Sequence, residues 1–313
     1  MPQPTAPLPL TVISGYLGAG KTTLVNHLLR HAAGRRLMVL VNDFGDLAID
    51  ADLIEREDGD MLTLANGCVC CSMGGDFYNA LVDVLDMPNR PDHLVIEASG
   101  VARPARIANI ARAEPDLALD GVVTLVDAEN VTAHLADDLV ADSVADQIAA
   151  ADLLLVNKAD LASPQDLAAL KDRLNAINPA PPVMTCISGA VPVDTVLGAR
   201  PSAWDTDGAS GHDHEHEETY ARWSHETAAP FDREKLQQAL AAFPDTVLRV
   251  KGIVFVTDRA EPLAVHRVGR RVTIADAPAS SSPDRTSRLV AIGHRAGFDP
   301  TLLTRLVEGA LAL

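Results

Sequence analysis

The residues best suited to chemistry begin at position 15, where Gly15 to Thr22 read GYLGAGKT. This is the G-x-x-x-x-G-K-[ST] pattern of a phosphate-binding loop, and it lies between a strand-like apolar stretch and a helix-like stretch, as such a loop requires. Backbone N–H groups and the positive helix end attract phosphate. Lys21 is expected to reach the β- and γ-phosphates, and the Thr22 hydroxyl to ligate Mg²⁺, so both are candidate catalytic residues. The expected nucleotide contacts are Gly15, Gly18, Ala19, Gly20, Lys21, Thr22 and Thr23.

A second polar group, Asn157-Lys158-Ala159-Asp160, follows another apolar stretch and forms an N-K-x-D tetrapeptide. The Asp160 carboxylate can accept hydrogen bonds from N1–H and the exocyclic amine of guanine. Adenine has an unprotonated N1 there and would leave the carboxylate unpaired. Asn157 can tie this loop to the phosphate loop, and the Lys158 stem can lie along the base. The turn at Ser188 resembles a backbone contact to the base, although any turn could give that pattern. The expected nucleotide is GTP.

Between these motifs, residues 94–100 read LVIEASG, which looks like a Walker B strand. Glu97 can hold the water shell of Mg²⁺ or orient the attacking water, and Gly100 can sense the γ-phosphate through its N–H. The alternative is that Glu97 is a partly buried carboxylate that caps the following turn.

Three of the four cysteines, Cys68, Cys70 and Cys71, lie within four residues of one another. Thiolates so placed can converge on one cation and leave a fourth position for an outside ligand. They favour Zn²⁺, with Co²⁺ as a near substitute. The alternative is a permanent zinc knuckle that fixes the loop, although closed zinc sites normally use four protein ligands. Cys186 follows an apolar stretch and is expected to be buried and inert.

Histidines cluster further along, where four of the ten fall within fourteen residues: His212, His214, His216 and His225. In an extended chain, positions two apart project to one side, so the first three imidazoles can share a cation. The alternative is a solvated acidic linker that binds metal only opportunistically.

The elements that must position these residues follow from the alternation of apolar and amphipathic stretches over the first 200 residues. The strands expected are 10–14, 37–42, 93–99, 121–127, 153–158 and 182–188. The helices expected include 22–32, 76–87 and 164–177. This βαβ pattern predicts an α/β fold, a P-loop NTPase domain with a mostly parallel sheet covered by helices on both faces. Ligands in such sheets bind at the carboxyl ends of the strands, where the motifs fall.

Composition changes near Pro201, where a polar, acidic stretch with Gly and Ser reads as a linker or flexible loop. Beyond it, strands at 219–227, 246–258, 262–269, 270–277 and 288–294 segregate from helices at 231–243 and 299–313, the last with Asp299 as its N-cap. This rhythm predicts a smaller α+β domain on an antiparallel sheet. The domains expected are 1–200, a linker at 201–219 that carries the histidines, and 220–313.

The formal net charge is -17, and such an acidic surface repels nucleic acid and anionic membranes. No stretch approaches the roughly 18 apolar residues of a membrane span. The N-terminal residues show no basic region and no apolar run of signal-peptide length, so a cytoplasmic location is expected.

In this order and spacing, GYLGAGKTT, VNDFGDLAID, NGCVCC, IEASG and NKAD resemble the CobW family of P-loop GTPases. That family belongs with the nickel-insertion GTPases of hydrogenase and urease maturation. The likeness covers about the first 190 residues, and residues 223–313 resemble the family's C-terminal domain.

The resemblance implies a GTPase metallochaperone in which Cys68, Cys70 and Cys71 bind the transferred metal and nucleotide state tunes its affinity. The family usually has Asn-Glu-Phe-Gly-Glu where residues 42–46 of this chain read NDFGD, so both acids are one methylene shorter. By resemblance, Asp43 is expected to act in catalysis and metal binding, and Asp46 in metal binding. A homodimer is implied on the same ground.

The function expected is therefore slow GTP hydrolysis, to GDP and phosphate, that controls delivery of Zn²⁺ or Co²⁺ to an unidentified client protein. The segment from Asp43 to Cys71 lies between the P-loop and Walker B strands, so it can couple nucleotide state to thiol geometry. Two rivals stay open: a P-loop kinase or ATPase, which prefers adenine, and a nucleotide-binding metal buffer with negligible turnover.

Overall fold

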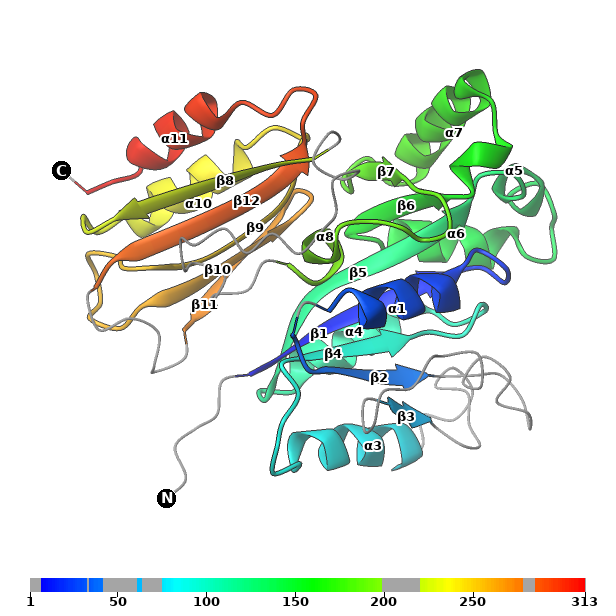
Figure 1. The fold of residues 1–313 in the computed structure, drawn as a ribbon, viewed down its shortest axis with the longest axis horizontal. Helices are drawn as coiled ribbons and strands as arrows, with labels where there is room; N and C mark the ends of the chain where they lie inside the picture. The colour runs from blue at the N-terminus through cyan, green and yellow to red at the C-terminus, as the bar shows by residue number, and fades with distance from the viewer. Residues whose placement is uncertain are drawn as a thin grey trace. The chain divides into compact units, whose positions relative to one another are not determined.

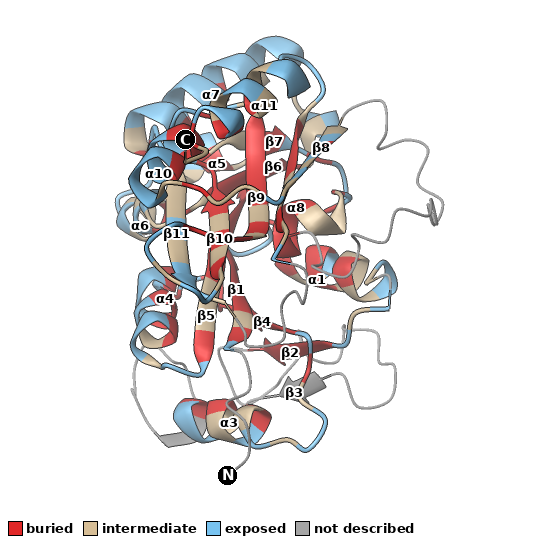
Figure 2. Cartoon of the chain, turned by 90° about the vertical axis from the view of Figure 1, so that its left-hand side faces the viewer, coloured by how far each residue is buried: buried red, intermediate tan, exposed pale blue. Residues whose placement is uncertain are grey.

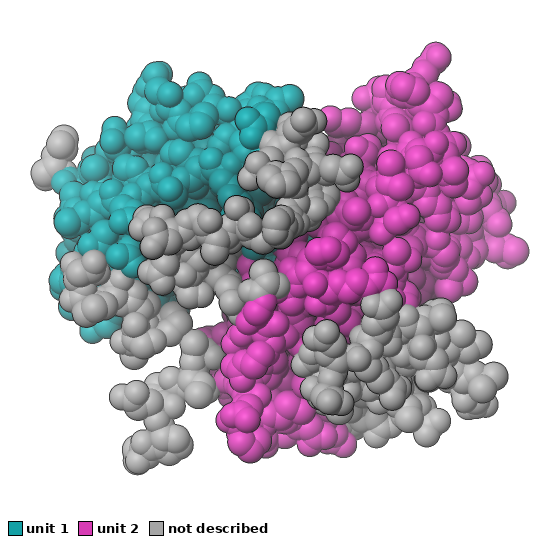
Figure 3. Space-filling view, viewed as in Figure 1, with its two compact units in different colours: residues 1–6, 194–313 teal, residues 7–193 magenta. Residues whose placement is uncertain are grey.

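The computed structural model describes residues 7–32, 34–41, 61–63, 75–198, 220–277 and 285–312. These form two compact units, residues 7–193 and the described part of 194–312 (Figure 3). Among the described helices, none is long and apolar enough to cross a membrane.

The first unit is built on a seven-stranded sheet of order β3-β2-β4-β1-β5-β6-β7 (Figure 1). Every neighbouring pair in it is parallel. Its strands are β1 (Leu8–Gly15), β2 (Leu37–Val41), β3 (Met61–Thr63), β4 (His93–Glu97), β5 (Leu117–Asp127), β6 (Leu153–Asn157) and β7 (Val183–Thr185). β1, β2, β4 and β6 are almost wholly buried, which explains their near-continuous Val, Leu and Ile sequences.

Helices pack on both faces of this sheet, as the sequence predicted. Alternate residues of β1, β2 and β4 share one buried cluster with α3 and α4, and α1 lies on the opposite face (Figures 1 and 2). The helices are α1 (Lys21–Arg30), α3 (Gly75–Leu85), α4 (Pro104–Ala113), α5 (Val131–His134), α6 (Ala141–Ala149), the 3-10 turn η1 (Ala159–Leu161) and α7 (Pro164–Ile177). Ser163 caps α7 by accepting from the Asp166 N–H at 3.1 Å.

The strand order reverses at β1, whose neighbours β4 and β5 both come later in the chain. This topological switch point is where open α/β sheets bind ligands, outside the carboxyl ends of their strands. Glu97, Asp127 and Asn157 are the last residues of β4, β5 and β6. The sheet therefore brings three polar side chains from distant positions to one edge.

The second unit is a five-stranded antiparallel sheet of order β11-β10-β9-β12-β8. Its elements are α8 (Val193–Leu197, of which the last four residues belong here), β8 (Tyr220–Thr227), α10 (Arg233–Ala241), β9 (Val247–Val254), β10 (Leu263–Val268), β11 (Arg271–Asp276), β12 (Ser287–His294) and α11 (Pro300–Glu308). One face packs with α10 and α11 around Trp223, Phe231 and Phe243. Asp299 caps α11 by accepting from the N–H groups of Thr301 and Leu302. The predicted α/β plus α+β fold class is confirmed.

Candidate nucleotide-binding site

The phosphate loop connects β1 to α1 and runs directly over the switch point. Gly20 is the N-cap of α1 and has a left-handed φ of 98°, which disfavours any residue with a Cβ. A Cβ there would also collide with the Asn157 side-chain amide. Gly20 is therefore required both by the loop conformation and by the approach of the N-K-x-D loop.

Three polar side chains lie at this loop, those of Lys21, Thr22 and Glu97. Lys21 is buried, and its Nζ donates to the Tyr16 carbonyl at 3.4 Å. Thr22 Oγ1 donates to Glu97 Oε1 at 3.0 Å across 75 residues of sequence. Glu97 is 2% exposed, so the carboxylate at the end of β4 faces the phosphate loop from within the sheet.

The turn after Glu97 lies against the phosphate loop at Gly100. A Cβ on Gly100 would lie 2.9 Å from the Leu17 backbone nitrogen and would also collide with the Leu17 side chain. The turn is closed by a hydrogen bond from the Ala102 N–H to the Ser99 carbonyl at 2.9 Å. Only glycine allows this approach without moving one of the two loops.

Asn157 joins three loops of the site. Its Nδ2 donates to the Ala19 carbonyl of the phosphate loop at 2.9 Å, and its Oδ1 accepts from the Gly189 N–H at 3.0 Å. The sequence predicted a tie between the N-K-x-D loop and the phosphate loop, and this hydrogen bond provides it. The loop after β7, which contains Ser188, is held by the same side chain.

Lys158 is oriented by Asp127, a residue that the sequence analysis did not single out. Lys158 Nζ lies 2.7 Å from Asp127 Oδ2. Burial alone would raise the pKa of Asp127, but hydrogen bonds from Lys158, Asn130 and the Glu129 N–H outweigh it and lower that pKa. The sequence did carry a signal for this residue, because Asp127, like Glu97, is an acidic residue at the end of an apolar stretch.

The remaining base-side candidates lie on the surface around this network. Asp160 in η1 and Ser188 are both exposed, and Ser188 has a left-handed φ of 50°. His27 Nε2 lies 2.8 Å from the Val191 carbonyl and joins α1 to the segment after Ser188. Cys186 is buried, as predicted, and burial raises the pKa of its thiol to about 12.

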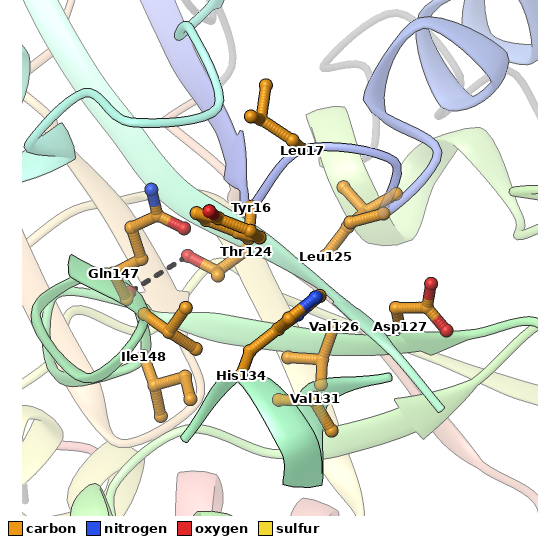
Figure 4. A pocket seen from close by; sticks show the side chains of 12 residues that line it. Tyr16, Leu17, Thr124, Leu125, Val126, Asp127, Val131, His134, Gln147 and Ile148 are labelled. Atoms are coloured by element: carbon orange, nitrogen blue, oxygen red, sulfur yellow. Dashed lines mark hydrogen bonds between the residues drawn. The ribbon is translucent and has the colours of Figure 1, made fainter. Parts of the chain in front are cut away.

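A small pocket lies beneath the phosphate loop, against β5, α5 and α6 (Figure 4). The rings of Tyr16 and His134 meet across it with centroids 4.7 Å apart. Its lining is Tyr16, Leu17, Ala19, Thr124, Leu125, Val126, Asp127, Val131, His134, Val144, Gln147 and Ile148. Three residues of the phosphate loop, Tyr16, Leu17 and Ala19, thus line one side of this pocket.

The predicted metal ligands fall outside the described residues: Asp43, Asp46, Cys68, Cys70, Cys71, His212, His214 and His216. Within the described ranges, no three His, Cys, Asp or Glu side chains gather as a metal site. His225, the fourth histidine of the sequence cluster, lies on β8, where its ring stacks on Trp223 at 5.8 Å.

A phosphate loop after β1, an acid at the end of β4 and an N-K-x-D loop tied back to the phosphate loop define a GTPase-type P-loop protein, here joined to an α+β domain. Residues 9–185 match the model of the CobW/HypB/UreG nucleotide-binding domain, and residues 220–311 match the C-terminal domain of the cobalamin synthesis protein CobW. The chain belongs to the CobW family, and the resemblance seen in its sequence is confirmed.

Similar proteins cover most of the chain. It is 32% identical to the zinc chaperone CobW of Sinorhizobium sp, over 91% of this chain and 92% of that protein. It is 30% identical to the zinc chaperone CobW of Pseudomonas aeruginosa, over 98% of this chain and 92% of that protein. The Zn(II)-bound YjiA GTPase of E. coli has a TM-score of 0.48 at 22% identity, over 98% of this chain and 100% of that chain.

Proposed function

We propose that the chain binds and hydrolyses GTP and acts as a metallochaperone that delivers Zn²⁺, or Co²⁺, to a client protein. The observation that carries the nucleotide part is the pair of hydrogen bonds from Asn157 to the Ala19 carbonyl and from the Gly189 N–H to Asn157. They hold the guanine-selective loop at a set distance from the phosphate loop. The family and the relatives named zinc chaperones support the metal part.

In this proposal the phosphates lie on the N–H groups of residues 15–23, with Lys21 at the β- and γ-phosphates. Thr22 Oγ1 and Glu97 Oε1, 3.0 Å apart, are hard oxygen atoms of the kind Mg²⁺ prefers. Bound there, Mg²⁺ would neutralise phosphate charge. Glu97 orients water, Gly100 meets the γ-phosphate through its N–H, and Asp43 remains a further catalytic candidate from the sequence.

On the base side, Asp160 accepts from guanine and Lys158 lies along the ring, oriented by Asp127 at 2.7 Å. Ser188 supplies the backbone contact. A kinase or ATPase would prefer adenine, so GTP and ATP titrations of the wild-type chain distinguish a GTPase from these two alternatives. Tighter binding of ATP than of GTP would overturn the guanine assignment.

For the metal we propose Cys68, Cys70 and Cys71 as the thiolate site and Asp43 and Asp46 as further ligands. The histidines His212, His214 and His216 would acquire the metal or hand it over. Because coupling between two ligands is reciprocal, nucleotide-dependent metal affinity must accompany metal-dependent nucleotide affinity. A GTP analogue that leaves Zn²⁺ affinity unchanged would remove the chaperone mechanism. The proposed homodimer rests on the family resemblance alone.

The deciding experiment measures metal content and Zn²⁺ affinity with and without GTP for the wild type, Cys70→Ser and a deletion of residues 211–217. We expect tight, nucleotide-sensitive binding to be lost in Cys70→Ser and kept in the deletion. Loss only in the deletion would move the cargo site to the histidines. Turnover that stays negligible with metal bound would favour the metal buffer instead.

A further inference from the structure

Gln147 on α6 is a buried polar side chain to which the sequence analysis assigned no role. It is 1% exposed, although glutamine is rarely found wholly buried. Its Nε2 donates to the Gly100 carbonyl at 2.9 Å and to the Ala102 carbonyl at 3.3 Å. One amide group thus holds two carbonyls of the turn that follows Glu97.

The position of α6 is itself fixed against the central sheet beneath the phosphate loop. Thr124 Oγ1 on β5 donates to the Gln147 backbone carbonyl at 3.1 Å (Figure 4). Gln147 also lines the pocket below Tyr16 and Leu17. The side chain therefore extends from a rigid element to the turn, and Leu17 of the phosphate loop packs against Gly100 of the same turn.

These bonds set the direction of the peptide groups in the turn. A trans peptide is planar, so a carbonyl and the following N–H point in opposite directions. The Ser99 carbonyl is held by the Ala102 N–H at 2.9 Å, which sets the direction of the Gly100 N–H. Gln147 holds the next carbonyl and the one at Ala102. The Ser99–Ala102 hydrogen bond thus sets the Gly100 N–H directly, and the two Gln147 hydrogen bonds hold the turn that this bond closes.

We propose that Gln147 is a positioning residue for GTP hydrolysis, whose side-chain amide holds the Ser99–Ala102 turn so that the Gly100 N–H meets the γ-phosphate. The inference rests on the proposed GTPase function. Because the β-phosphate is held by the phosphate loop and not by this turn, Gln147 acts on GTP and on turnover but not on GDP.

The test compares Gln147→Met, which keeps the length of the side chain but has no donor, with a matched control at Asn178, the C-cap of α7, whose side chain bonds to the end of α6. Asn178 is also buried, and its Nδ2 donates to the Ile148 and Ala149 carbonyls at the end of α6 and to the Ala151 carbonyl just beyond it. Asn178→Leu therefore removes the same kind of hydrogen bond from α6 without touching the turn.

For Gln147→Met we expect turnover to fall by roughly 10- to 100-fold and the affinity for a non-hydrolysable GTP analogue by about 10-fold, with GDP affinity within about twofold of wild type. Hydrogen exchange in residues 98–102 should become faster. Asn178→Leu should lower the melting temperature but leave the ratio of GTP-analogue to GDP affinity unchanged. Equal ratios in wild type and Gln147→Met, with the wild type active, would overturn the positioning role alone.

Two further outcomes complete the test. If Gln147→Met does not fold, Gln147→Asn replaces it, because its shorter amide cannot span both carbonyls, and the same loss of GTP selectivity is expected. A wild-type chain that binds GDP and the GTP analogue but never hydrolyses GTP, even with metal, would overturn the proposed GTPase function and the role of Gln147 together.

Discussion

The two units bury charged side chains for different purposes. In residues 7–193, Lys21, Glu97 and Asp127 are buried near the carboxyl ends of parallel strands, around the phosphate loop. In the second unit, Arg249 and Arg267 are buried within an antiparallel sheet and donate to backbone carbonyls of the same unit. The first set lies around the proposed nucleotide-binding site, whereas the second set donates to backbone carbonyls of its own unit.

The net charge also differs between the N-terminal and C-terminal parts of the chain. Residues 1–219 carry 13 Lys and Arg against 33 Asp and Glu, a net charge of -20, whereas residues 220–313 carry 13 against 10, a net charge of +3. The sum is the -17 of the whole chain. The acidic balance used to exclude nucleic acid and membranes therefore describes the nucleotide-binding part and the histidine segment, and not the C-terminal domain.

The largest effect is expected for Lys21→Ala. Loss of the buried cation from the phosphate loop should lower kcat/KM for GTP by about 1,000-fold or more, because a preorganised charge at the phosphates is lost. Steady-state hydrolysis and a fluorescent GTP titration measure this. Chemical unfolding should show the second unit unchanged. Turnover within tenfold of wild type would place Lys21 outside the catalytic machinery.

Arg267→Met should have the opposite effect, a loss of stability without a loss of GTP binding. Arg267 donates to the Val247 carbonyl at 2.7 Å and the Phe243 carbonyl at 3.0 Å, and burial lowers its pKa to about 10. Removing it takes a charged donor from both buried carbonyls, so the free energy of unfolding should fall by about 2–4 kcal/mol. GTP affinity should stay within about twofold.

The control for this prediction is the nearby Arg270, which is 56% exposed and pairs with Asp245. Arg270→Met should change the free energy of unfolding by less than about 1 kcal/mol, because solvent screens exposed pairs. Urea titrations of both variants compare the two arginines. Equal destabilisation would show that burial is not what distinguishes them.

Asp127→Asn tests the base side of the first unit. Without the ion pair at 2.7 Å, Lys158 is no longer held, and affinity for both GTP and GDP should fall by about fivefold. The free energy of unfolding should fall by about 1 kcal/mol at pH 7. A loss confined to GTP would instead place Asp127 at the γ-phosphate.

The effect of Asp127→Asn on the free energy of unfolding should also depend on pH. The pKa of Asp127 is lowered from its ordinary 3.8 by the fold, so the stability it contributes is fully present above pH 3.8 and is lost as pH falls through the lowered pKa. The difference in unfolding free energy between wild type and Asp127→Asn should therefore be constant near neutrality and shrink in acid. A difference that grows as pH falls would contradict the assigned ion pair.

The smallest effect is expected for Cys186→Ala. With the pKa of its thiol raised to about 12, Cys186 stays protonated at neutral pH and should resist alkylation in the native protein. Zn²⁺ affinity should stay within about twofold of wild type. Mass spectrometry after iodoacetamide treatment at pH 8 measures which thiols react, and modification of Cys186 before the other three would contradict its burial.

Much of the fold was predictable, because its signals are local. The helix at 164–177 and the Asp299 cap appear where the apolar period and the capping residue placed them. α4 and α6 were not assigned from the sequence, although both are amphipathic. Because α6 was not assigned, the position of Gln147 on a helix was not predicted either. The cytoplasmic location, the exclusion of nucleic acid and membrane partners, and the metal ligands stay predictions.

The sequence by itself determined the phosphate loop and the N-K-x-D tetrapeptide, because each is a run of neighbouring residues whose spacing alone specifies its chemistry. Only the tertiary structure decided what holds them together. Asn157 lies 138 residues from its partner Ala19, and Gln147 lies 47 from Gly100. No local spacing encodes such pairs, since they meet only after the parallel sheet has brought its strand ends to one edge.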